Sequence, residues 1–281
     1  MIGQNVLKQL CKKWNEDPAK IPSLLLIVGP QGTGKKTAVE YIRKNVKNDG
    51  MFRAEANSVS AVREVIEKSY QLGGAVYYVF MDCDNMSVAA KNAMLKVMEE
   101  PPQGARFILT VKNYYNMLNT IRSRAFLYQM FPYSKKELEH FVTTYDGPEK
   151  VKAVKLGFPY SNCPGNILRL SKMPDAGQGM IDYARLMADY VGEATQANVL
   201  KISTKLDIKN DDPDKYPVDL FLYAAEEAFF KQYCKTHKVR DYACMKRVAG
   251  ASAELNLHVA SKQNLIDCLL LDLRRMQGAE R

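Results

Sequence analysis

The sequence has few of the residues from which metal sites and disulfide frameworks are built. Three histidines and six cysteines are spread over 281 residues, and no two cysteines are separated by only two residues. Structural zinc usually needs closely spaced Cys and His ligands, so we expect no zinc and no other resident metal. Free thiols in a reducing compartment are the expected state of the cysteines.

Long hydrophobic runs are also missing. The longest purely aliphatic run, Leu24 to Val28, is far shorter than the ~20 residues that span a bilayer. Residues 1–14 mix polar and basic residues into an apolar pattern, which indicates an amphipathic helix and lacks the apolar stretch of a signal peptide. We therefore expect a cytoplasmic protein without a membrane partner.

Charge of the two signs is unevenly distributed. The net charge is +9, and residues 1–130 hold 18 Lys and Arg against 11 Asp and Glu, so most of the excess lies in the first half. A basic part of this kind suits contact with a polyanion such as nucleic acid, and a solvated surface explains it equally well.

The length favours two or three domains.

Apolar segments that alternate with helical patterns fill the first 130 residues. Three of them predict buried strands, because they are continuous, rich in β-branched and aromatic residues and bounded by turn residues: 21–28, 75–81 and 106–111. Helical spacing follows Lys35 and covers residues 57–70, where Asn57 or Ser58 would be the N-cap, and residues 87–98. This alternation predicts an α/β fold with a parallel sheet.

The rest of the chain is predicted to be helical. Short helices are expected at 134–145, 148–157 and 165–172, a linker at 174–179, and long helices at 217–236 and 251–276. Apolar stripes on the long helices would form an intrachain core or, alternatively, a contact with other subunits. They include Leu255, Val259, Ile266, Leu269, Leu270 and Leu273.

A phosphate-binding loop is predicted between the first strand and the helix after it. Gly29, Gly32, Gly34 and Lys35 satisfy the pattern G-x-x-x-x-G-K in the strand-to-helix context that this motif requires. Glycines let backbone N–H groups cradle phosphate oxygens, and the helix N-terminus adds partial positive charge. Lys35 would reach the β- and γ-phosphates of ATP or ADP. The alternative is a tight turn without a ligand.

The hydroxyl that normally follows the lysine and holds Mg²⁺ is displaced in this loop. Lys36 occupies that position, and the hydroxyl comes one residue later as Thr37. One residue on a helix turns a side chain by about 100°, so Thr37 would point away from the metal position. The pattern argues for nucleotide binding and against coordination of Mg²⁺.

A single acid follows the segment 75–81. Nucleotidases keep a metal-holding acid and a water-activating acid together at such a strand end, but here Met81 precedes Asp82 and the pair is incomplete. Asp82 is therefore a degenerate form of the acidic motif. The alternative is that Asp82 or Asp84 caps the following helix.

Two segments resemble a known family. Residues 81–102 and 106–124 are similar to the clamp-loader branch of the AAA+ ATPases, and within it to the delta-prime subunits of bacterial DNA polymerase III. Asn92 to Pro102 resembles the family's Asn-Ala-Leu-Leu-Lys-x-Leu-Glu-Glu-Pro-Pro helix, and Thr120 to Ala125 its Thr-Ile-x-Ser-Arg-Cys segment. Ile2-Gly3-Gln4 resembles the family's opening, near the adenine pocket. The resemblance covers roughly residues 1–130.

The resemblance implies three domains and a set of partners. An AAA+ nucleotide-fold domain would occupy residues 1–130, a small helical lid 131–175, and an all-α collar for oligomerisation 176–281. Such a subunit helps to load the sliding clamp onto primed DNA during DNA replication. The implied partners are the other clamp-loader subunits (gamma/tau and delta), the sliding clamp and the backbone of primed DNA.

Arg124 is the catalytic residue that the resemblance implies. In clamp loaders this arginine reaches the ATP site of a neighbouring subunit, where its planar fork stabilises charge on the transferring phosphoryl group. On spacing alone, a surface arginine or an intrachain salt bridge is the favoured interpretation, and the resemblance of the surrounding Thr-Ile-x-Ser-Arg segment reverses that preference. Thr110 is interpreted as a core-strand threonine.

Three departures from the family predict a stator with no or weak ATPase activity. Besides Met81 and the displaced hydroxyl, Asn166 stands near the place of the lid arginine of motor subunits, and Arg169 comes almost one turn later. The zinc-binding insertion of many delta-prime subunits is also missing, because residues 41–56 contain no cysteine.

Two rival functions remain open. The first is an active motor of the gamma/tau type, which Lys35 and the glycines favour and which Met81, Lys36 and Asn166 oppose. The second is a free-standing P-loop enzyme such as a small-molecule kinase, which would need a second substrate pocket and a phosphate-clamping lid.

Overall fold

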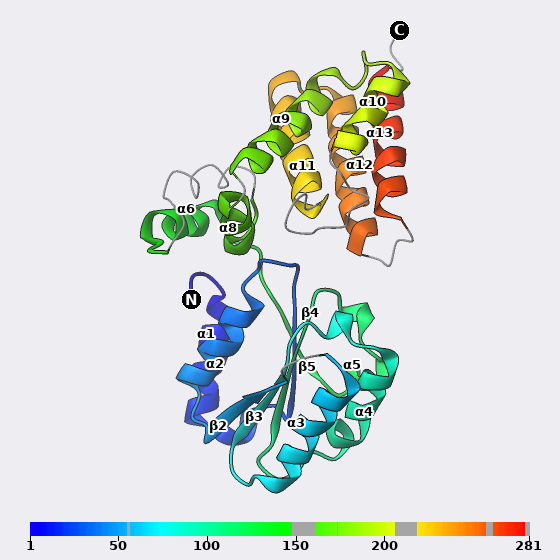
Figure 1. The fold of residues 1–281 in the computed structure, drawn as a ribbon. Coiled ribbons are helices and arrows are strands. Elements are labelled where there is room, and N and C mark those ends of the chain that lie inside the picture. The colour runs from blue at the N-terminus through cyan, green and yellow to red at the C-terminus, as the bar shows by residue number, and fades with distance from the viewer. Residues whose placement is uncertain (55–56, 148–160, 173, 206–217, 257–260, 279–281) are drawn as a thin grey trace. The chain divides into compact units, whose positions relative to one another are not determined.

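The computed structural model describes residues 1–54, 57–147, 161–172, 174–205, 218–256 and 261–278. It separates into two compact units, Met1–Glu137 and Leu138–Arg281, and each is described by itself (Figure 1). The predicted helix at 148–157 lies outside the described residues. The division into three domains at residues 130 and 175 stays a prediction.

The first unit is built on a five-stranded sheet in which every pairing is parallel. Its strand order is β2-β3-β4-β1-β5. The strands are β1 (Leu24–Val28), β2 (Gly50–Arg53), β3 (Val76–Phe80), β4 (Arg106–Val111) and β5 (Phe126–Gln129). The three predicted strands are confirmed as β1, β3 and β4, and the two edge strands are additions. The α/β class is therefore confirmed.

Helices cover both faces of this sheet (Figure 1). Because side chains alternate along a strand, Leu25 and Ile27 pack under α1 and α2, whereas Leu24 and Leu26 pack under α3 and α4. The helices are α1 (Asn5–Glu16), α2 (Lys35–Asn45), α3 (Val59–Gln71), α4 (Val88–Glu99) and α5 (Asn119–Arg122), with short 3₁₀ turns at Pro18–Lys20, Cys83–Asn85 and Tyr114–Asn116. The two buried faces hold the sheet rigidly beneath its loops.

Serine side chains begin two of these helices. Ser58 accepts a hydrogen bond from the backbone N–H of Ala61 at 3.3 Å, and Ser87 accepts one from Ala90 at 3.2 Å. Ser58 is thus the N-cap of α3, one of the two predicted candidates. Because Ser87 caps α4, the alternative that an aspartate performs this role is wrong.

The second unit is described as helices alone. They are α6 (Lys135–Thr144), which begins at the end of the first unit, α8 (Pro164–Lys172), α9 (Pro174–Tyr190), α10 (Gln196–Lys205), α11 (Val218–Thr236), α12 (Val239–Asn256) and α13 (Lys262–Gly278). Helix α11 packs against α9 and α12, and α13 packs against α10 and α12 (Figure 1).

Two helix predictions for this unit are wrong. The expected linker at 174–179 is the first part of α9, because proline is well tolerated in the first turn of a helix. The expected helix at 251–276 is two helices, since α12 ends at Asn256 and α13 begins at Lys262.

Apolar stripes of the second unit form a core within the chain. Ile266, Leu269, Leu270 and Leu273 are fully buried and Leu255 packs against them, whereas Val259 lies outside the described residues. All six cysteines are free thiols, of which Cys234 and Cys268 are exposed. None of the helices in the described part of the chain is both long and apolar enough to cross a membrane.

Candidate functional site

The P-loop joins the carboxyl end of β1 to the N-terminus of α2. Gly32 and Gly34 adopt φ angles of 81° and 87°, a left-handed region that favours glycine. Gly34 is the N-cap of α2 and has no side chain with which to cap it, so the first N–H groups of the helix remain available to an anion. The loop therefore has the backbone shape that fits a phosphate group.

Lys35 is folded back onto this loop. Its ammonium group donates hydrogen bonds to the carbonyl oxygens of Gly29 at 2.6 Å and Pro30 at 3.1 Å, and the residue is only 7% exposed. Lysine has no acceptor, so its charge is already solvated by the loop itself. To bind a β- or γ-phosphate, Lys35 would have to exchange these carbonyls for phosphate oxygens.

Tyr133 covers the loop from the end of the first unit. Its hydroxyl donates a 2.9 Å hydrogen bond to the carbonyl of Thr33, and it would lie 3.3 Å from a Cβ atom at Gly34. The tyrosine ring also approaches Gly3, where an added Cβ would lie 3.1 Å from the ring. Tyr133 thus fills the space between the P-loop and the segment Ile2-Gly3-Gln4.

Gln4 fastens this arrangement to the sheet. Its side-chain amide donates to the carbonyl of Phe131 at 2.7 Å, and its oxygen accepts from the Phe131 N–H at 3.0 Å and from the Tyr128 hydroxyl at 2.9 Å. The residue is 4% exposed, so these bonds are shielded from water. We call this set of contacts the Gln4 clasp; it fixes the backbone two residues before Tyr133.

The acidic strand end contains two aspartates with different surroundings. The Asp84 carboxylate accepts hydrogen bonds from the backbone N–H groups of Lys112 and Asn113 and from the side chain of Asn116, so it organises the loop after β4. Asp82 is half-buried with φ at 50°, and among the described residues none forms a hydrogen bond or ion pair with its carboxylate. Of the two carboxylates, that of Asp84 is engaged in the loop after β4, and that of Asp82 is not engaged by the described residues.

Thr110 is a fully buried strand residue, as the sequence predicted. Its hydroxyl accepts a 2.9 Å hydrogen bond from the backbone N–H of Asp82 and lies 3.8 Å from the sulfur of Met81. The threonine thus joins the carboxyl ends of β3 and β4. Its hydroxyl holds the Asp82 backbone in place.

The positions that hold Mg²⁺ in other P-loop proteins carry an incomplete set of ligands here. Lys36 and Thr37 are both exposed on the first turn of α2, and Met81 is 8% exposed where a second acid would be needed. Mg²⁺ prefers octahedral oxygen coordination, usually with one or two carboxylates. Asp82 supplies one carboxylate, and the neighbouring thioether supplies none.

Arg124 lies at the opposite end of the sheet from the P-loop. It comes two residues before β5, whose Phe126 pairs with Leu25 near the amino end of β1, whereas Gly29 follows the carboxyl end of the same strand. At ~3.3 Å per residue, the two positions differ by about 20 Å along the strand direction. Arg124 is therefore not placed to contact a phosphate in its own P-loop.

The Arg124 guanidinium is held by weak partners at the surface. One nitrogen lies 3.2 Å from a carboxylate oxygen of Glu99, and another donates to the carbonyl of Thr120 at 2.9 Å. The two charged side chains are 44% and 46% exposed, and an ion pair of this kind is worth about 0–1 kcal/mol. The predicted salt bridge and the predicted finger are thus compatible, because the guanidinium can be released easily.

The arginine near the expected lid position is used inside the second unit. Arg169 pairs with Asp219 at 2.8 Å and is only 16% exposed, and it donates a 3.4 Å hydrogen bond to Asn166. This pair ties α8 to α11. Asn166 itself is 7% exposed.

Three functional candidates were not found from the sequence. Gln4 and Tyr133 are separated from their partners by 100 residues or more, and Glu99 at the end of α4 meets Arg124 in the turn between α5 and β5. For Gln4, the match of Ile2-Gly3-Gln4 to the family's opening was the available signal. Nothing in the local pattern marks Tyr133.

Comparison with solved structures gives the class of the fold. The RuvB Holliday junction branch migration motor of Thermotoga maritima is similar to this chain with a TM-score of 0.54 and 15% identity, and the match covers 79% of this chain and 88% of that one. Together with the parallel sheet and the P-loop, this likeness confirms the predicted AAA+ fold.

Comparison with known sequences shows which proteins parts of the chain resemble. Residues 47–134 match the family described as "DNA polymerase III, delta subunit". The DNA polymerase III subunit delta' of Escherichia coli is 42% identical over 77 residues, which are 26% of this chain and 23% of that protein. The same subunit of Buchnera aphidicola is 35% identical over 95 residues, which are 34% of this chain and 28% of that protein.

A further relative is similar to this chain over a longer segment at lower identity. The replication factor C small subunit of Sulfurisphaera tokodaii is 27% identical over 150 residues, covering 49% of this chain and 45% of that protein. The chain thus matches less than half the length of these relatives. The predicted resemblance to the delta-prime subunits of DNA polymerase III is confirmed over part of the chain.

Proposed function

We propose that the chain is a stator subunit of a clamp loader. In this role it supplies Arg124 to the ATP site of a neighbouring motor subunit while the sliding clamp is loaded onto primed DNA. The observation that carries the proposal is the position of Arg124 at the amino end of the sheet, with its own P-loop at the carboxyl end. An arginine finger in that position can act only on a partner's nucleotide.

The contacts of the P-loop support a passive role for the chain's own site. Lys35 is engaged by two carbonyls of the loop, and Tyr133 is bonded over Thr33. The backbone shape of the loop suits ATP or ADP. The phosphate groups of a bound nucleotide would lie at the N-terminus of α2. A nucleotide would have to displace the contacts of both Lys35 and Tyr133 in order to bind. Because the set of metal ligands is incomplete, hydrolysis at this site would be weak.

An active motor of the gamma/tau type is the second candidate. The left-handed Gly32 and Gly34 and the uncapped N-terminus of α2 favour it, because together they form a complete phosphate cradle. A motor would need its own Lys35 for turnover, whereas a stator would not. The two proposals therefore differ in which residue of this chain the assembly depends on.

The test is ATP turnover by the reconstituted assembly of this chain with gamma/tau-type and delta-type subunits, sliding clamp and primed DNA. Arg124→Ala should lower turnover by about 10³-fold, since an arginine finger supplies ~10³–10⁵ in rate. Arg124→Lys should also be defective, because a lysine lacks the planar fork. Arg43→Ala removes another half-exposed, paired arginine and should leave turnover unchanged.

The same assay separates the two candidates. Lys35→Ala should leave most of the turnover if the chain is a stator, with assembly checked by size-exclusion chromatography. A collapse caused by Lys35→Ala together with normal turnover of Arg124→Ala would replace the stator by the motor. Normal turnover of both variants would remove both functions.

A further inference from the structure

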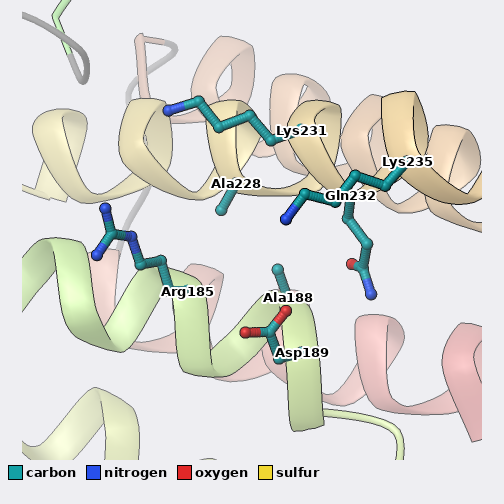
Figure 2. A pocket seen from close by; sticks show the side chains of 7 residues that line it. All are labelled: Arg185, Ala188, Asp189, Ala228, Lys231, Gln232 and Lys235. Atoms are coloured by element: carbon teal, nitrogen blue, oxygen red, sulfur yellow. The ribbon is translucent and has the colours of Figure 1, made fainter.

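A cavity of about 320 Å³ lies between α9 and α11 in the second unit (Figure 2). Ala188 and Ala228, which are 2% and 8% exposed, face each other between the two helices. Because alanine has only a methyl group, the helix pair leaves a hollow there. Longer side chains surround it, namely Arg185 and Asp189 from α9 and Lys231, Gln232 and Lys235 from α11.

The lining of this cavity is basic. Three cations and one carboxylate give it a net charge of +2, with Arg185 and Lys235 on opposite sides of the hollow in Figure 2. Lys231 and Lys235 are four residues apart on one helix, a spacing at which like charges destabilise the helix by a few tenths of a kcal/mol. An anion bound between the two lysines would attract both ammonium groups and so offset their mutual repulsion.

Gln232 requires a hydrogen-bond donor, which an anion without N–H or O–H groups does not supply. Its side-chain oxygen is buried and has no hydrogen-bond partner among the described residues. A buried acceptor left unsatisfied costs about 1–3 kcal/mol, so the site favours a ligand that also brings an N–H or O–H donor. Asp189 is a second acceptor at the same cavity.

We propose that this cavity binds an acidic peptide segment of a partner protein. Carboxylates of the segment would pair with Arg185, Lys231 and Lys235, and a backbone N–H would donate to Gln232. The phosphodiester backbone of a DNA duplex offers charge but no N–H or O–H donor. An extended acidic peptide offers carboxylates and free backbone N–H groups on neighbouring residues, which is why we assign the site to this chemistry.

The test uses the full chain and a fluorescein-labelled hexaglutamate peptide, with binding followed by fluorescence anisotropy at an ionic strength of about 0.1 M, where the Debye length is about 10 Å. Lys231→Glu combined with Lys235→Glu should weaken binding at least about tenfold, which is ~1.4 kcal/mol. Gln232→Leu keeps the charge and should weaken binding about threefold to tenfold by removing one hydrogen bond. Circular dichroism confirms that each variant remains helical.

Matched charge changes outside the cavity provide the control. Lys201→Glu combined with Lys246→Glu alters the net charge equally on α10 and α12, and should leave the affinity within about twofold of the original after screening. An equal loss in this control would overturn the proposal in favour of general attraction. An unchanged affinity of Gln232→Leu, or full displacement of the peptide by equimolar inorganic phosphate, would reduce the site to an anion site and would also overturn it.

Discussion

The polar side chains at the two ends of the parallel sheet differ in how deeply they are buried and in how firmly they are hydrogen-bonded. At the carboxyl end, Lys35 and Gln4 are 7% and 4% exposed and bonded to the backbone around them. At the amino end, Arg124 and Glu99 form one pair that is nearly half exposed. The comparison teaches that a P-loop fold can place its available cation at the end opposite to the loop.

The energetic contrast follows from burial. Releasing Lys35 means breaking two hydrogen bonds of a buried ammonium group, and hydrogen bonds to charged groups are worth about 1.5–3 kcal/mol each. Releasing Arg124 from Glu99 costs at most about 1 kcal/mol. The amino end is thus prepared for a partner, whereas the carboxyl end is stabilised internally.

The largest effect on stability is expected from the Gln4 clasp. Gln4→Ala removes three hydrogen bonds and leaves the N–H of Phe131 and the hydroxyl of Tyr128 without their partner, so the free energy of unfolding should fall by about 2–3 kcal/mol. Urea denaturation measures this. Gln103→Ala, at an exposed position in the turn before β4, is the control, with an expected change below about 0.5 kcal/mol. A loss below 1 kcal/mol for Gln4→Ala would contradict the view that the clasp holds this end of the sheet.

Alkaline pH should destabilise the first unit by a similar amount. Burial raises the pKa of Tyr77 and of Tyr128 to about 12 from the usual 10. The folded state therefore retains protons that the unfolded state loses, so stability is full below pH 10 and falls as pH rises toward 12, by on the order of 2 kcal/mol for one tyrosine. Urea titrations at successive pH values measure the slope.

Phenylalanine variants of the two tyrosines sharpen this test. Each should reduce the alkaline slope, but only Tyr128 loses a hydrogen bond, to Gln4, because the Tyr77 hydroxyl has no partner among the described residues. At neutral pH, Tyr128→Phe should cost about 1 kcal/mol and Tyr77→Phe should cost less than about 0.5 kcal/mol. Equal costs would show that the hydrogen bond at the carboxyl end contributes nothing.

Opening the carboxyl end should improve nucleotide binding. Tyr133→Phe removes the hydrogen bond to the Thr33 carbonyl, worth about 1 kcal/mol, so the isolated chain should bind a fluorescent ATP analogue up to about fivefold more tightly. Tyr145→Phe, at the residue directly after the end of α6, serves as the control for general effects. An unchanged affinity for Tyr133→Phe would mean that this tyrosine does not compete with nucleotide.

The smallest effect is expected at the amino end. Glu99→Gln removes the charge that pairs with Arg124, and the free energy of unfolding should change by less than about 1 kcal/mol. In the reconstituted assembly, turnover should stay the same or rise by less than about fivefold. A fall of tenfold or more would indicate that Glu99 positions the arginine actively.

The central strands could be predicted from sequence because burial on both faces makes them continuous apolar runs. β1 and β3 are buried at every residue, and both were found. The edge strands β2 and β5 were missed, because each has four residues and most of these are partly or fully exposed. An edge strand has one neighbour and less burial, so its sequence carries little periodic signal.

The P-loop of the candidate site could be predicted, but the contacts that Tyr133 and Gln4 make around it could not. Gly32, Gly34 and Lys35 follow one another, so the motif is local and its backbone conformation follows from glycine. Tyr133 and Gln4 act through contacts across the fold, for which a single sequence gives no spacing rule. Arg124 was found through resemblance, and its distance from the P-loop became apparent only from strand register.

The Gln4 clasp also constrains the order of events during synthesis and folding. Gln4 bonds to Phe131, 127 residues further along the chain. At a synthesis rate of about 5–20 residues per second, the segment that carries Gln4 leaves the ribosome's active site roughly 6 to 25 s before its partner is made. During that interval α1 cannot pack against β5, because β5 is also synthesised late. The first unit therefore completes its folding late, through a non-local contact of the kind that slows folding.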